Sequence, residues 1–128
     1  MLGLFSLFGR SAALKALEHA LREVGLHPLV VPEAVKITIV RLNKEEAAAG
    51  AGPREAAYAE AAQLLAYCML GRDQFIASNS VHAADRAELR VEHALIAGDS
   101  LDAKLILLAL HSGIVAPSIA ERLEVEDG

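Results

Sequence analysis

A chain of 128 residues is long enough for one domain with its own hydrophobic core. Its net charge of −5, with 12 basic residues scattered among 17 acidic ones, argues against a nucleic-acid partner, which needs clustered Lys and Arg. The single cysteine, Cys68, excludes an internal disulfide and suits a reducing, cytoplasmic compartment. No membrane span is expected, because the longest uncharged stretch, 105–120, is shorter than the ~20 residues that a bilayer needs.

The chain begins with an apolar arm, residues 1–10. Its large side chains include Leu4, Phe5 and Phe8, which we predict to pack on the protein's own core or on a neighbouring subunit. Contact of residues 1–9 with a membrane surface is a weaker alternative, because interfacial helices usually add a strongly basic face. The arm has neither a basic leader nor a cleavage site, so we do not expect a signal peptide.

Helices are predicted from the spacing of apolar residues and from capping signals. The first follows Ser11 as N-cap and stops at Gly25. Its apolar face carries residues three or four positions apart, Leu14, Leu17, Leu21 and Val24. Val35–Leu42 alternates like a strand but also has apolar residues at helical spacing. Because no other segment resembles a partner strand, and a lone strand leaves its backbone unpaired, the helix is favoured.

The middle of the chain is expected to hold two further helices of the same single domain. Residues 47–53 are small and are interpreted as an internal linker. A third helix is predicted over about 54–70, followed by a short helical turn or loop over Arg72–Ser80. A fourth helix is predicted over Val81–Ala97, with Leu95 facing inward.

The fifth helix, Leu101–His111, is predicted at the centre of the bundle, with Ser100 as its N-cap. After Lys104 it is apolar on every face, which is typical of a helix surrounded by others. We therefore expect replacement of Leu107 or Leu108 by alanine to cost about 2–5 kcal/mol. The fold class expected from these elements is all-α, a compact bundle of five or six helices.

A last short helix is predicted from Pro117, and residues 124–128 are expected to fray. Residues 105–126, LILLALHSGIVAPSIAERLEVE, resemble the first helix and the positioning helix of winged and helix-turn-helix DNA-binding domains, over about a sixth of the chain. In those families a recognition helix follows at once, whereas here only Asp127 and Gly128 follow. DNA binding therefore ranks third among the functional hypotheses.

Five histidines raise the question of a metal site, but none is predicted. His82 and His93 are about 16 Å apart along one helix and cannot share an ion. The sequence has none of the Glu-x-x-His repeats of helical di-iron sites. Phosphate-binding loops and the Gly-x-Ser-x-Gly nucleophile elbow are also absent. We expect no metal, no cofactor and no catalytic residue.

Two residues are candidates for contact with a ligand, Tyr67 and His111. His111 ends the fifth helix, where a histidine bonds free carbonyls or lies at the edge of a pocket. Tyr67 projects opposite Cys68, which we expect to be a buried, inert thiol, and with Leu70 gives its helix a second apolar face. Either another helix of the same chain or a second subunit is expected to cover this face. Tyrosine is enriched in such contacts, and packing within the chain is the favoured alternative. The interface candidates are Leu4, Phe5, Phe8, Tyr67 and Leu70.

The leading hypothesis is a non-catalytic, cytoplasmic interaction or structural module that forms a homo-oligomer or binds a protein partner. It rests on the apolar arm, the two-faced third helix and the absence of clustered polar chemistry. The alternative is a small-ligand-binding protein or enzyme with a pocket between helices, because functional residues can converge from distant positions. A pocket with converging polar side chains would favour that alternative, and a dry, solid core would count against it.

Overall fold

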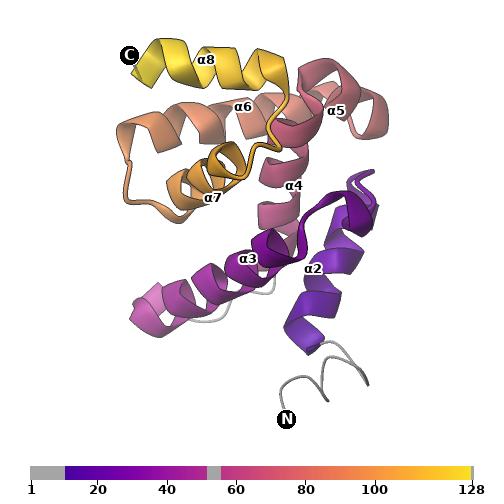
Figure 1. Ribbon diagram of the computed structural model, residues 1–128, viewed down its shortest axis with the longest axis vertical. Helices are drawn as coiled ribbons and strands as arrows, with labels where there is room; N and C mark the ends of the chain where they lie inside the picture. Colours follow the sequence, from indigo (N-terminus) through magenta and orange to yellow (C-terminus); the bar gives the residue numbers. More distant parts are fainter. Residues whose placement is uncertain (1–10, 52–55, 128) are drawn as a thin grey trace.

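The computed structural model describes residues 11–51 and 56–127, and within these ranges all regular structure is helical (Figure 1). The α-helices are α2 (Ala12–Glu23), α3 (Glu33–Glu46), α4 (Ala57–Leu70), α5 (Arg72–Ser78), α6 (Val81–Ile96), α7 (Leu101–His111) and α8 (Pro117–Asp127). A 3-10 turn, η1 (Pro28–Val30), joins α2 to α3, and a π-helical turn, η2 (Ala47–Ala51), follows α3. The predicted all-α class is confirmed, and Val35–Leu42 is helical within α3.

Serine N-caps start three of these helices. Ser11 Oγ accepts a hydrogen bond from the backbone N–H of Leu14 at 3.1 Å, and Ser100 Oγ does the same for Ala103 at 3.1 Å. Ser80, which the sequence interpretation did not single out, caps α6 in the same way. Each serine satisfies an N–H that has no partner within its own helix, which explains why the predicted starts of α2 and α7 are correct.

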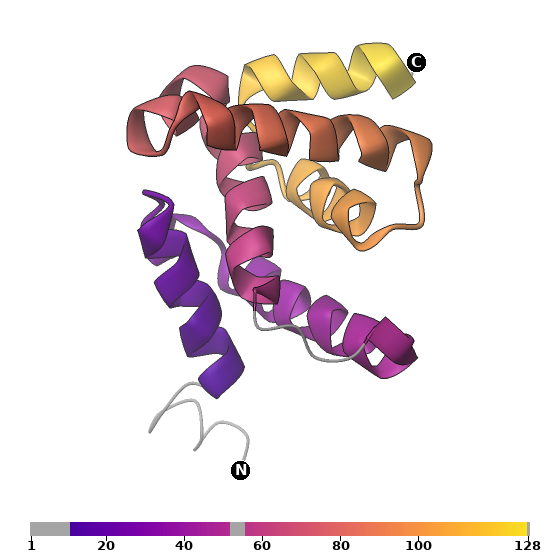
Figure 2. The ribbon, with the colours of Figure 1, turned by 180° about the vertical axis from the view of Figure 1, so that it is seen from behind.

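The core is built around α4, against which α2, α3, α5, α6 and α7 all pack. Figures 1 and 2 show α4 between the α2–α3 pair and the group formed by α6, α7 and α8. Its buried side chains are Ala61, Ala62, Leu64, Leu65, Ala66, Tyr67 and Cys68. Small alanine side chains let neighbouring helices approach closely, so one helix can be covered on nearly every side.

α7 has the predicted bounds and packs against α3, α4 and α6. Its buried side chains are Ala103, Leu105, Ile106 and Ala109. Leu107, however, is 46% exposed, and Leu108 is only partly buried. The expectation that other helices cover α7 on every side is therefore corrected at its outer face. An apolar helix is buried only where other helices reach it, and on this side none of the described helices does.

Two expected irregular segments are more helical than predicted. Ala47–Ala51 continues α3 by a π-helical turn, interrupted at Gly50 with φ 115°, because alanine strongly favours helix. The remainder of the proposed linker, 52–53, lies outside the described residues, as do the arm 1–10 and its Leu4, Phe5 and Phe8. α8 stays helical to Asp127, beyond the point where we expected fraying, because neither glycine nor proline interrupts residues 124–127.

Charged and polar side chains tie the helices together. The buried Lys36 of α3 forms ion pairs with Glu18 of α2 at 2.8 Å and with Glu33 at 3.2 Å. Arg72 of α5 bonds Asp85 of α6 at 2.7 Å. Burying an ammonium group is costly unless it is paired, so the Lys36 contacts determine how α2 and α3 pack.

The end of α2 meets the end of α5 at an unusually close approach. Gly25 has φ +86°, and a Cβ added there would lie 2.6 Å from Cβ of Ser78. The amide of Asn79 donates to the carbonyl of Val24 at 3.0 Å across the same junction. Only glycine satisfies both the positive φ and the short distance.

Candidate functional site

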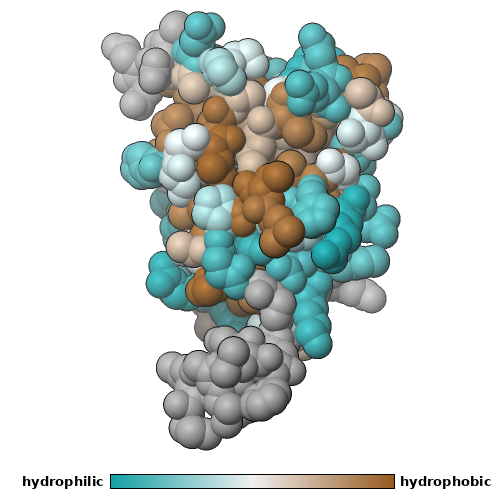
Figure 3. All heavy atoms as spheres, turned by 45° about the vertical axis from the view of Figure 1, so that its right-hand side comes forward, coloured by the Kyte–Doolittle hydropathy of each residue, from teal (hydrophilic) through white to brown (hydrophobic). Residues whose placement is uncertain are grey.

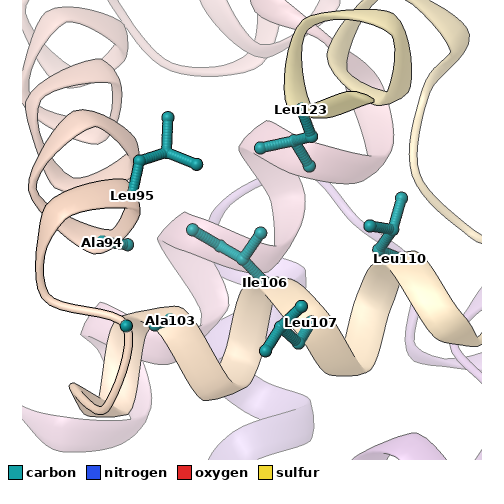
Figure 4. Close-up of a pocket in the computed structure, with 8 residues that line it drawn as sticks. Ala94, Leu95, Ala103, Ile106, Leu107, Leu110 and Leu123 are labelled. Carbon is teal, nitrogen blue, oxygen red and sulfur yellow. The ribbon is translucent and has the colours of Figure 1, made fainter. Parts of the chain in front are cut away.

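An apolar groove of about 220 Å³ lies between α6, α7 and α8 (Figure 4). Its lining residues are Ala94, Leu95, Gly98, Ala103, Ile106, Leu107, Leu110 and Leu123. On α7 these residues fall at positions i, i+3, i+4 and i+7, so they share one face of the helix. The groove therefore runs along one face of α7, from the buried Ala103 and Ile106 to the exposed Leu107.

Small residues produce the hollow. Ala94, Gly98 and Ala103 carry at most a methyl group, so they leave space that larger side chains would fill. Leu95 and Leu107 stand at the edge and are 40% and 46% exposed. We expected Leu95 to face inward, and the structure instead places it beside the opening (Figure 4).

Charged pairs join the helices that form the groove. Arg122 of α8 pairs with Glu88 of α6 and approaches Glu92 to 3.8 Å. On the α7 side, Arg90 of α6 bonds both carboxylate oxygens of Asp102. Because each wall is tied to α6 by a charged pair, the groove is set by the fold and is a preformed surface.

Tyr67 belongs to the core and not to an exposed surface. It is buried, its ring meets Phe75 edge-to-face at 5.6 Å, and its hydroxyl donates to Glu88 Oε1 at 3.0 Å. Of the two alternatives for this face, packing within the chain, which we favoured, is what the structure shows, and the buried Tyr67 is not available at the lip of a pocket. The physical reason is that Arg72–Ser78 forms the helix α5, which places Phe75 against the face of α4 that carries Tyr67. Leu70, on the same helix, is partly buried against the core.

The other sequence candidates do not gather into a site. His111 is exposed at the end of α7 and does not line the groove. Cys68 is buried, and burial raises the pKa of its thiol to about 12, which disfavours the reactive thiolate. Among residues 11–51 and 56–127, no three His, Cys, Asp or Glu side chains are arranged to hold a metal ion. None of the described helices is long and apolar enough to cross a bilayer.

The fold and the groove define a small all-α protein with an apolar surface hollow. Comparison with known proteins does not assign the chain to a family, because no protein-family model, no curated protein and no solved structure matches it. Its function is therefore inferred from its own residues.

Sequence reasoning missed the residues that make the groove. Leu95, Leu107 and Leu123 come from three different helices, and each taken alone looks like an ordinary core leucine. The one available signal was that α7 is apolar all round, which is compatible either with complete burial or with a surface that binds something else.

Proposed function

We propose that this protein is a non-catalytic interaction module that self-associates through the groove between α6, α7 and α8. The observation that carries the proposal is a preformed apolar hollow with Leu95 and Leu107 exposed at its edge. Exposed leucines beside an apolar hollow are typical of a surface that another protein covers. A buried, single thiol is consistent with a cytoplasmic location, which belongs to the same proposal.

The occupant that fits best is a second copy of the chain. Ile96 follows Leu95 directly and is 85% exposed, so an apolar projection lies next to the apolar hollow. In a two-fold symmetric dimer the same patch of both copies is in contact. Each copy inserts its projecting side chain into the other and receives the equivalent side chain in return. The pairing of a hollow with an adjacent projection is the arrangement that such a dimer needs, with Ile96 of each copy in the groove of the other.

Exposed apolar residues also occur away from the groove, and they provide a control. Leu29 on η1 is 84% exposed and does not line the groove. Figure 3 shows one face of the molecule, on which hydrophobic side chains (brown) lie between hydrophilic ones (teal). Exposure alone therefore does not distinguish an interface from the rest of the surface. The groove differs because its exposed Leu107 lies beside an apolar hollow.

Light scattering on the full chain at several concentrations tests the proposal. We expect a dimer mass for the wild type and for Leu29→Glu, and a monomer mass for Leu107→Glu and Ile96→Glu, because a buried glutamate without a partner is costly in the interface. Circular dichroism checks that each variant is folded. A wild-type monomer at the highest concentration, or a dimer that survives both groove substitutions, would overturn the proposal.

A further inference from the structure

A second hollow, of about 160 Å³, lies between α3, α4, α6 and α7, and it is lined by converging polar side chains. Its polar lining residues are Asn43, Glu46, Glu60, Arg90, Ser100 and Asp102. The first two come from the end of α3, and the others from α4, α6 and the start of α7. Such convergence from distant parts of the chain is the feature that a small-ligand site requires.

The basic group in this hollow, the guanidinium of Arg90, already forms hydrogen bonds within the protein. The guanidinium of Arg90 donates to both carboxylate oxygens of Asp102 and, through Nη1, to the carbonyl of Glu60 at 2.8 Å. These bonds use three of its five N–H groups. Arg90 therefore acts mainly to hold Asp102 in place, and the hollow has little capacity left to bind an anion.

A second observation, independent of the shape of the hollow, is the buried side chain of Asn43. Asn43 is only 8% exposed, and its amide nitrogen donates to the carbonyl of Ile39 at 2.9 Å, one turn back on its own helix. Its carbonyl oxygen accepts no hydrogen bond from the residues that the structure describes. A buried acceptor gains free energy from a donor, so a ligand in the hollow that donates to this oxygen would form a favourable hydrogen bond.

Glu46 lines the same hollow and follows Asn43 by about one turn, on the same face of α3. Glu46 forms no ion pair with the described residues. Asn43 and Glu46 therefore offer two acceptors, one neutral carbonyl and one carboxylate, and a donor with positive charge complements both. A hollow of about 150 Å³ accommodates a molecule the size of benzene, so the space suits a small organic group.

We propose that this hollow binds a small organic ammonium ion, whose N–H groups donate to the carbonyl of Asn43 and the carboxylate of Glu46. A metal ion fits less well, because the described carboxylates do not form a metal-binding group of three. The ligand class is thus a primary amine with a short carbon chain, and its alkyl part would contact Leu101 and Leu105, which also line the hollow. This site is separate from the groove, and it does not depend on the proposed self-association.

Isothermal titration of the full chain with propylammonium chloride at constant ionic strength tests this proposal, with sodium propionate as the matched anion. We expect saturable binding of propylammonium and none of propionate. Glu46→Gln removes the charge, and Asn43→Leu removes the acceptor at similar size, so each should weaken binding about tenfold or more. Glu45→Gln, at the exposed neighbouring position, is the control and should leave the affinity unchanged.

Three results would overturn the proposal: no saturable binding of propylammonium, equal binding of propionate, or the same loss of affinity in Glu45→Gln as in Glu46→Gln. If Asn43→Leu fails to fold, as judged by circular dichroism, the partly buried Glu46→Gln decides the question by itself. Amide chemical shifts that move at α3 and at the start of α7 support the site, and shifts confined to other elements refute it.

Discussion

Arg90 and Asp102 meet side by side, with Nε 2.9 Å from Oδ2 and Nη2 2.8 Å from Oδ1, and so join α6 to α7. A planar guanidinium matches a carboxylate in this two-bond arrangement, which gives a fixed orientation as well as attraction. Asp102 also lies in the first turn of α7, where the helix dipole favours negative charge. The pair contributes to the wall of the polar hollow and holds the α7 side of the apolar groove.

Replacing Asp102 by asparagine is expected to lower the free energy of unfolding by about 1–3 kcal/mol. The change removes the charge, and it leaves Arg90 with a weaker acceptor. Both side chains remain about a quarter exposed, which places the loss below that of a fully buried pair. Urea denaturation measures the effect. The control is Asp99→Asn, an exposed acid three positions earlier, which should change stability by less than about 0.5 kcal/mol.

Tyr67→Phe should cost about 1–3 kcal/mol, because it leaves the ring against Phe75 and removes only the hydroxyl bond to the carboxylate of Glu88. Thermal and urea unfolding provide the measurement, and Tyr58→Phe, at a partly buried tyrosine on the same helix, is the comparison. Equal stability of wild type and Tyr67→Phe would mean that the hydroxyl bond does not contribute to folding.

Two leucines of α7 should respond very differently to alanine. Leu105 is buried, so Leu105→Ala is expected to destabilise the protein by about 2–5 kcal/mol through lost burial and a cavity. Leu107 is nearly half exposed, so Leu107→Ala should cost less than about 1 kcal/mol at concentrations where the protein is monomeric. Similar losses at both positions, measured by urea unfolding, would mean that the outer face of α7 is covered.

The thiol of Cys68 should be inert in the folded protein. Burial raises its pKa to about 12, whereas a thiol in an unfolded chain has a pKa of about 8.5. Between these values the unfolded chain loses the proton and the folded chain keeps it, so stability falls as the pH rises through this window. A thiol reagent at pH 8 should label Cys68 only after urea is added, and rapid labelling without urea would contradict the assigned burial.

The helices themselves could be predicted because their signals are local. Ser11 and Ser100 mark two helix starts through hydrogen bonds to residues only three positions away, and the apolar stripe of α2 lies within one element. The choice of helix for Val35–Leu42 succeeded for a related reason, since a strand would have needed a partner that the sequence lacks.

The surroundings of each helix could not be predicted, because they depend on where other helices pack. The sequence did not say which element covers Tyr67, and in the structure α5 covers it with Phe75. Leu107 looked like core, although its side of α7 is open. Asn43, Arg90 and Asp102 come from three helices with no shared spacing. Neither the apolar groove nor the polar hollow therefore has a signature in the order of residues.

One backbone hydrogen bond between α4 and the start of α8 reports on the stability of the groove. The amide of Ala116, just before α8, donates to the carbonyl of Cys68 at 2.8 Å, in the last turn of α4. Helix carbonyls in that turn lack the usual partner, so this bond persists only while the start of α8 stays docked. In hydrogen exchange the Ala116 amide should therefore be slow for a residue between helices, and its protection measures the free energy needed to undock α8, which carries Leu123.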